Sequence, residues 1–89
     1  MSKELPATGT ERGEPMFRLN VESLLSAASR AGDRTGYAIS RTAGIAESSV
    51  YRILSGAAQP DLNTAMRLAV AYRVTVEELM DRVDLAAAA

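Results

Sequence analysis

The chain has 89 residues, no Cys, no His and a formal net charge of −1. A chain of this length makes one domain with a modest core; lacking Cys and His, it has no disulfide, thiol nucleophile, usual zinc ligand or neutral-pH general base, so we expect neither an enzyme nor a metal or cofactor site. No apolar run approaches the roughly 20 residues that span a bilayer, and residues 1–15 lack the apolar centre of a signal peptide, so we expect a soluble, cytoplasmic protein.

The two ends of the chain lack the pattern of packed helices. Residues 1–15 hold two Pro, two Gly and two Thr among charges of both signs, which is typical of a mobile arm, and we place that arm at residues 1–17. Residues 85–89 are mostly Ala and have nothing to pack against, so we expect a frayed tail. The folded domain is therefore expected at residues 18–84.

The first helix is predicted over residues 20–31. Asn20 suits an N-cap and Gly32 suits a helix stop. Its apolar residues recur at i, i+3, i+4 and i+7, and they are Val21, Leu24, Leu25 and Ala28.

Gly44 separates a second helix from a third. Thr35 can cap the second helix, which contains Ile39 and ends at Gly44, where we expect a left-handed backbone that costs any other residue about 1 kcal/mol. The stretch AESSVYRILSG, residues 46–56, follows at once and predicts a third helix that ends at Gly56. Because so few residues separate the two short helices, they must cross steeply.

Two further helices follow a loop. Asp61 caps the fourth helix, and its inner stripe is expected to be Leu62, Ala65, Met66 and Ala69, flanked by Leu68 and Tyr72. Thr75 and Glu78 form a capping box that opens the fifth helix, whose inner row is expected to be Val76, Leu79, Met80 and Val83. No segment shows a convincing strand pattern, so the expected fold class is all-α, a compact bundle of five helices.

The third predicted helix has two unlike faces. On a period of 3.6 residues, Val50, Ile53 and Leu54 fall together. The opposite side carries Glu47, Ser48, Tyr51, Arg52 and Ser55. One face therefore suits a core, and the other is free to contact a partner.

One spacing joins the second and third helices into a unit. The small Ser40 lets the helices approach, and Gly44 makes the corner between them. Val50 and Ile53 then pack the third helix back on the second. A rigid unit of this kind, with one helix face turned to solvent, is a helix-turn-helix.

The stretch TGYAISRTAGIAESSVYRILSGAAQPDLNTAMRLAVAYRVTVEELM resembles the lambda-repressor-like, XRE/Cro-type helix-turn-helix family. The resemblance covers about residues 20–82. It includes the order of five helices, the loop from Gly56 to Pro60, and the Val-Thr pair before a helix that ends in Glu-Glu-Leu-Met. It implies a helical bundle that binds double-stranded DNA, usually as a dimer on a palindromic operator, and usually regulates transcription.

By the same resemblance the third helix is the recognition helix, whose first turns enter the major groove. The forked donor of Arg52 suits the O6 and N7 atoms of guanine. Glu47 either accepts from a cytosine amine or only favours the positive end of its helix, and Tyr51 either contacts DNA or covers part of a small core. The expected base-contacting residues are Glu47, Ser48, Ser49, Tyr51 and Arg52. The expected phosphate-contacting residues are Arg34, Thr35, Gly36, Tyr37 and Ser55.

Several positions depart from the family pattern. Gly36 stands where the family commonly has a Gln that contacts phosphate. Ala46 replaces the usual Ser or Thr cap, and Arg73 stands where Gly commonly ends the fourth helix. Ser40 replaces the commonest residue, Ala, which is a small change. We expect the loss at Gly36 to be made up by Arg34 or Tyr37.

Positive charge is concentrated in the middle of the chain. Residues 30–67 carry five Arg against three carboxylates, a net charge of +2, whereas residues 1–22 and 70–89 are net negative. Arg makes forked contacts to phosphate and to guanine, although a balanced solvated surface is the alternative for any single Arg. The middle of the chain is therefore the part that suits nucleic acid.

A single recognition helix reads too few base pairs to select an operator, so we expect a homodimer on a two-fold symmetric site. The expected interface residues are the apolar ones near the C-terminal end, Leu79, Met80, Val83 and Leu85. The favoured interpretation is a bacterial or phage repressor. One alternative is an antitoxin-like or adaptor DNA-binding protein whose N-terminal arm binds a protein partner. The other is a scaffold that has lost DNA binding, which the net negative charge and the missing Gln favour.

Overall fold

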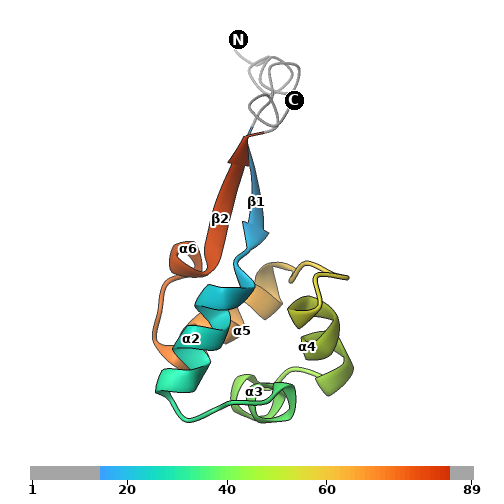
Figure 1. Ribbon diagram of the computed structural model, residues 1–89, viewed down its shortest axis with the longest axis vertical. Coiled ribbons are helices and arrows are strands. Elements are labelled where there is room, and N and C mark those ends of the chain that lie inside the picture. The colour runs from blue at the N-terminus through green and yellow to red at the C-terminus, as the bar shows by residue number, and fades with distance from the viewer. Residues whose placement is uncertain (1–14, 85–89) are drawn as a thin grey trace.

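The computed structural model describes residues 15–84. In chain order the elements are β1 (Pro15–Leu19), α2 (Val21–Arg30), α3 (Gly36–Ala43), α4 (Glu47–Leu54), α5 (Leu62–Tyr72), α6 (Val76–Leu79) and β2 (Met80–Asp84). Figure 1 shows the helices gathered into one body, from which the two strands leave side by side as a ribbon. Residues 1–14 of the expected arm, and the expected tail at residues 85–89, lie outside the described residues.

Four helices start at side-chain caps that the sequence predicts. At each start an oxygen of the cap side chain accepts a hydrogen bond from the backbone N–H three residues later, which satisfies a donor that the helix itself cannot. The caps are Asn20, Thr35, Asp61 and Thr75, with N···O distances of 2.9, 3.0, 2.8 and 3.1 Å. These four predicted helix starts are confirmed.

The two-stranded antiparallel sheet of β1 and β2 corrects the expectation of an all-α fold. The five helices are present, but the last one is short: α6 ends at Leu79, and Met80 has an extended backbone with φ −116° and ψ 146°. Met80 and Val83, which were expected on a helix face, therefore belong to a strand. At the other end, β1 begins at Pro15, so the boundary expected between residues 17 and 18 lies inside a strand.

Asn20 explains why the two strands meet. Its backbone N–H donates to the Leu79 C=O at 2.8 Å, and its side-chain amide donates to both carboxylate oxygens of Asp81 at 3.1 and 3.0 Å. The start of α2 is thus tied to the end of α6, and the adjoining chain segments leave the body together. Antiparallel pairing then gives partners to backbone groups that would otherwise have only water.

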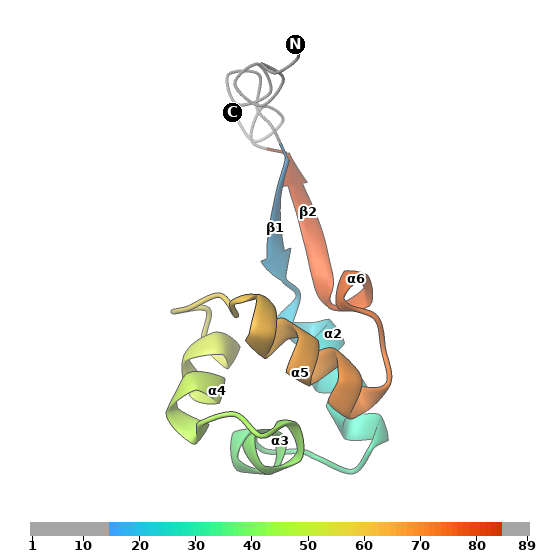
Figure 2. The same cartoon turned by 180° about the vertical axis from the view of Figure 1, so that it is seen from behind.

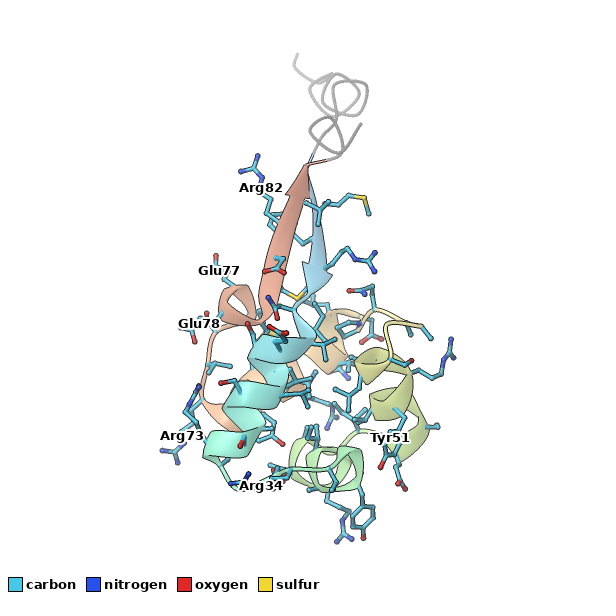
Figure 3. All side chains as sticks on the ribbon, in the orientation of Figure 1. Arg34, Tyr51, Arg73, Glu77, Glu78 and Arg82 are labelled. Atoms are coloured by element: carbon cyan, nitrogen blue, oxygen red, sulfur yellow. The ribbon has the colours of Figure 1, made fainter. Side chains whose placement is uncertain are left out.

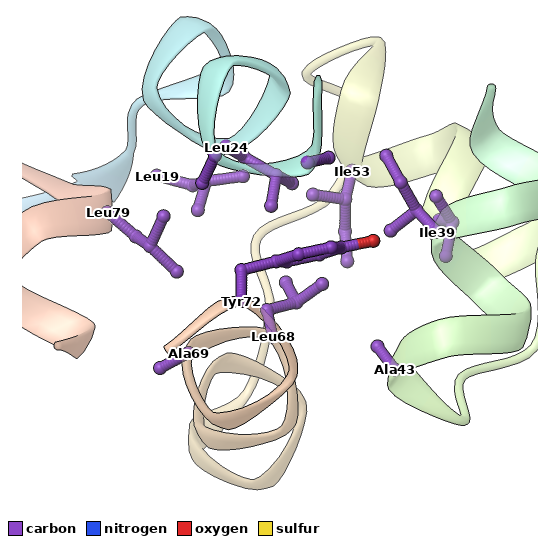
Figure 4. Packing of buried hydrophobic residues seen from close by; sticks show 12 residues of the cluster. Leu19, Leu24, Ile39, Ala43, Ile53, Leu68, Ala69, Tyr72 and Leu79 are labelled. Carbon is purple, nitrogen blue, oxygen red and sulfur yellow. The ribbon is translucent and has the colours of Figure 1, made fainter. Parts of the chain in front are cut away.

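The core lies between α2, α3, α4, α5 and α6, and its largest fully buried side chains are Leu24, Ile39, Leu68, Leu79 and Val50. Figure 4 shows Tyr72 lying across this cluster between Leu68 and Ile53. The buried Ser40 is satisfied because its hydroxyl donates to the Tyr37 C=O at 2.8 Å. The predicted core position of this small residue, between the second and third helices, is confirmed.

The inner face of α5 differs from the predicted stripe. Leu62 and Met66 were expected to point inward but are 76% and 47% exposed. The buried residues are Ala65, Leu68, Ala69 and Tyr72. The helix is apolar on both sides, so its pattern did not fix its rotation; the Tyr72 hydroxyl, which donates to Asp33 at 2.7 Å, is directed inward with the buried side. On α2, Leu25 was also predicted in the apolar row but is 41% exposed, whereas Leu24 and Ala28 are buried.

Candidate DNA interface

Gly44 makes the corner between α3 and α4. It takes the left-handed backbone predicted for it, with φ 72° and ψ 40°, a region that disfavours side chains with a Cβ. The N–H groups of Gly44 and Ile45 both donate to the Ser40 C=O, at 2.9 and 3.1 Å. A Cβ at this position would also lie 3.1 Å from the guanidinium of Arg67. Hydrogen bonds to α3 fix the backbone of this corner, and Arg67 of α5 lies against it. The helices α3 and α4 therefore form a helix-turn-helix.

This corner fixes which side of α4 faces solvent. Val50 and Ile53 are only 2% and 5% exposed and join the core, as the sequence predicts. The side chains expected to read bases are all exposed, and they are Glu47, Ser48, Ser49, Tyr51 and Arg52. Figure 2 shows α4 at the edge of the body, beside α3 and away from α6. The helix thus presents a polar face that no other described element covers.

Tyr51 rests on the first residue of α3. A Cβ built on Gly36 would lie 2.6 Å from Cε1 and 2.7 Å from Cζ of the Tyr51 ring, so only glycine permits this approach. Gly36 is buried, while Tyr51 remains 47% exposed; the ring is labelled in Figure 3. The ring occupies the side-chain position of Gly36, so the expected phosphate contact of this residue stays a prediction that concerns its backbone N–H alone. Tyr51 therefore packs α4 against α3 with one side of its ring, while the rest of the side chain stays exposed to solvent.

Two observations on the described residues concern metal ions and membranes. Within residues 15–84, no three acidic side chains lie close enough together to hold a metal ion. In the same range, no helix has both the length and the apolar character needed to cross a membrane.

A comparison with protein families agrees with this geometry. The model of the Cro/C1-type HTH DNA-binding domain matches residues 35–84, more than half of the chain. The chain belongs to the Cro/C1-type family. The match begins at the Thr35 cap and runs through both helices of the corner. No curated protein and no solved structure matches the chain. Membership of the Cro/C1-type family makes the protein a DNA-binding transcriptional regulator whose partner is double-stranded DNA.

In this Cro/C1-type domain the expected phosphate contacts differ in how free their donors are. Arg34 and Tyr37 are exposed beside the start of α3, and Figure 3 shows Arg34 at the lower rim of the body. The Thr35 oxygen accepts the capping bond, which leaves its proton free to donate. Ser55 differs, because its hydroxyl already donates to the Arg52 C=O at 3.0 Å. A phosphate contact through Ser55 would have to break that bond.

Arg41 is a further cation on this surface that sequence reasoning did not select. Its Nη1 donates to the Tyr37 hydroxyl at 2.7 Å, and its Cζ lies 5.7 Å from the centre of that ring. Both side chains are exposed. The signal in the sequence was their i, i+4 spacing, which brings two side chains together on one helix face. The ring therefore holds the guanidinium beside the expected phosphate contacts.

The start of α5 is unsuited to a phosphate. A hollow of about 200 Å³ lies between α4 and α5, with Ser49 and Arg52 on one side and Asp61 and Thr64 on the other. The Thr64 N–H bond to the Asp61 carboxylate lowers the pKa of Asp61, so this residue stays ionised. Its charge occupies the positive end of α5 that would otherwise attract an anion. The start of α3 differs, because its cap is the uncharged Thr35 and its first turn holds no acidic residue.

The residues expected at a dimer interface differ in how far they are buried. Leu79 is 1% exposed and belongs to the core of its own subunit, so its assignment to an interface is corrected. Met80 is half-buried and packs against that core. Val83 is half-buried on β2. Leu85 lies outside the described residues.

Proposed function

We propose that this Cro/C1-type protein is a repressor that binds a palindromic operator as a homodimer. The observation that carries the proposal is the opposed burial on α4, where Val50 and Ile53 are fixed in the core and Arg52 stands in solvent. A helix held in this way can enter the major groove without rearrangement of the domain. Occupation of a promoter by such a domain blocks transcription without any further activity, which favours repression over activation.

Each exposed side chain of α4 has a base feature that it suits. Arg52 is proposed to donate a forked pair of hydrogen bonds to guanine, and Glu47 to accept from a cytosine amine. Ser48 and Ser49 suit bases or phosphate. Tyr51 is proposed to place the free side of its ring against a thymine methyl group or to donate its hydroxyl to phosphate.

The phosphate contacts are proposed to come from the α3 side. Arg34, Thr35 and Tyr37 surround the start of α3, and Arg41 stands one turn later. Cations at this place neutralise phosphates and release counterions, which adds affinity without sequence preference. The net negative charge of the whole chain does not oppose this, because the positive charge lies in the segment that faces DNA.

Selection of bound sequences from random double-stranded DNA, at two salt concentrations, tests the proposal. We expect enrichment of an inverted repeat whose half-sites are about one helical turn apart, and an affinity that falls steeply as salt rises. A reporter downstream of the enriched sequence should be repressed when the protein is expressed. Recovery of unselected DNA at both salt concentrations would contradict sequence-specific binding and would favour a scaffold that has lost it.

A further inference from the structure

The ribbon of β1 and β2 exposes large apolar side chains. It projects away from the helices in both Figure 1 and Figure 2, and Phe17 and Met16 are 60% and 45% exposed on it. A two-stranded ribbon by itself is only marginally stable in water, and three or more strands or a packing partner are normally needed. The described residues supply no such partner for the outer part of the ribbon.

The strand register divides these side chains between two faces. Directly paired residues share a face, so Phe17 with Arg82, and Leu19 with Met80, lie on one side. Leu19 is buried and Met80 packs against the core, and this face therefore continues outward from the core through Phe17. We call it the Phe17 face. Arg18, Asp81, Met16 and Val83 lie on the other side.

The Phe17 face borders a hollow of about 310 Å³. The hollow lies between the ribbon and α6, and its lining residues are Phe17, Val76, Glu77, Met80 and Arg82. Glu77 and Arg82 are both exposed, and Figure 3 shows them on the same side of β2. One surface thus holds an exposed aromatic ring, an apolar recess, a carboxylate and a guanidinium.

We propose that the Phe17 face binds a second copy of this chain, related by a two-fold axis. A two-fold interface uses the same patch on both subunits, so the patch must complement itself. Here the Phe17 ring of each subunit can enter the hollow of the other, and each Arg82 can pair with Glu77 of the partner subunit. The proposal rests on the dimeric operator complex proposed above and names the surface that forms the dimer.

Pairing through the strand edges is less favourable than contact through this face. Pro15 has no N–H to donate, and the Leu19 N–H already donates to the Gln59 side chain at 2.8 Å. On β2, the Met80 N–H donates to the Glu77 C=O. Both edges are thus partly occupied near the body, which is how natural sheets avoid unwanted strand addition.

A second exposed apolar surface provides the matched control. Leu62, Met66 and Val70 lie on one side of α5 and are 76%, 47% and 70% exposed. Val70 resembles Phe17 because it is a well-exposed apolar residue of a regular element. The hollow beside Val70 lacks an oppositely charged pair, since Arg67 is its one charged lining residue. The lining residues are Thr42, Ala43, Met66, Arg67, Val70 and Ala71.

Sedimentation of the full chain without DNA tests the interface. We expect a concentration-dependent dimer, Phe17→Asp to raise its dissociation constant at least about tenfold, and Val70→Asp to leave it unchanged, because one buried charge opposes association strongly. Circular dichroism checks that both variants keep their helices. A wild-type chain that stays monomeric up to submillimolar concentration, or a dimer broken by Val70→Asp and not by Phe17→Asp, overturns the proposal.

A charge exchange tests the two-fold arrangement. Glu77→Arg and Arg82→Glu should each weaken the dimer, and the double variant should restore it, because both pairs then form again with opposite sign. Weak association of the double variant overturns the Glu77–Arg82 pairing. Arg52→Ala separates this result from DNA binding: it should leave sedimentation unchanged. If the ribbon variants do not alter association while DNA selection still enriches an inverted repeat, the interface is wrong and the proposed function stands.

Discussion

The ring of Tyr51 on α4 lies against Gly36, the first residue of α3, so closely that a methyl group at Gly36 would overlap two ring carbons. This contact links the helix proposed to face DNA to the segment that carries the expected phosphate contacts. The absence of a side chain at Gly36 therefore allows the Tyr51 ring to point toward α3.

We expect Gly36→Ala to push the Tyr51 ring away and to weaken operator binding by about 1–3 kcal/mol, the range for one lost base contact. The effect should depend on the ring. In a Tyr51→Ala background the same change should leave DNA affinity unaltered, because no ring remains to be displaced. Titration of the selected operator with the four proteins of this cycle measures the coupling. Equal effects of Gly36→Ala in both backgrounds would show that the contact does not position Tyr51.

Arg52→Ala should lower affinity for the selected operator and relax preference at one base position, by about 1–3 kcal/mol. Thermal stability should change little, because Arg52 is exposed. Repeating the selection with the variant shows which position has relaxed. Arg41→Ala is the comparison: it should weaken all sequences alike and reduce the salt slope by about one phosphate contact. Unchanged selectivity in Arg52→Ala would mean that another face of α4 reads the bases.

Ala46 leaves α4 without a side-chain cap, as the sequence predicts. Its φ of −59° and ψ of 139° already suit a capping residue, so Ala46→Ser should stabilise the fold by about 0.5–2 kcal/mol. Urea unfolding of the two proteins measures the difference. Ala46→Val offers no hydroxyl and should give no gain; a gain equal to that of Ser would point to a cause other than capping.

Arg73 ends α5 in the left-handed region, with φ 58° and ψ 41°, and it is a non-glycine residue with positive φ. A side chain there costs about 1 kcal/mol relative to glycine, so Arg73→Gly should raise the free energy of unfolding by roughly that amount. The melting temperature of Arg73→Lys, which keeps both the charge and the Cβ, should stay at the wild-type value. A gain in both variants would assign the effect to the arginine side chain.

Acid should weaken the fold partly through Asp33. The Thr42 and Tyr72 hydroxyls donate to its carboxylate at 2.6 and 2.7 Å and lower the pKa of Asp33. Burial, together with the bond to Asp33, raises the pKa of Tyr72, so its proton stays in place. A carboxyl group whose pKa is lowered by folding stabilises the folded state at pH values above its ordinary pKa of about 4. This contribution is lost as the pH falls through the lower pKa that the group has in the folded protein.

Tyr72→Phe removes one of the two donors, so it should be less stable than the wild type at pH 7. The difference in stability should shrink as the pH falls below the ordinary carboxyl pKa of about 4 and through the lower pKa of Asp33 in the folded protein. Urea unfolding at pH 7 and over this acidic range measures this difference. Asp61 has a lowered pKa of the same sign, but it is common to both proteins and cancels in the comparison. A stability gap that stays constant with pH would place the effect in packing and not in the carboxylate.

How far the sequence determines this structure depends on how local each signal is. Caps act over three residues, so Asn20, Thr35 and Asp61 could be recognised directly. The ribbon could not be recognised in this way, because β1 pairs with a segment that follows the last helix. Each strand has only five residues, which are too few to show a strand period. The same limit applies to the face of α5, which is apolar on two sides.

The candidate site divides in the same way. The outward face of α4 follows from helix period, and it was predicted. The contact between Gly36 and Tyr51 joins two helices, so the sequence showed that the family Gln is missing but did not show that the glycine makes room for a ring. Leu79 was assigned to an interface because its pattern is apolar, and pattern alone does not separate a residue of the core from one of a contact surface.

The bonds from Asn20 to Leu79 and Asp81 also make the ribbon depend on the helical body. β1 precedes all the helices and β2 follows them, so the two strands can pair only after the folded helices have brought the residues around Asn20 and Leu79 together. Loss of the core would separate these residues and unpair both strands at once. Any surface that the ribbon carries therefore exists only on a folded domain.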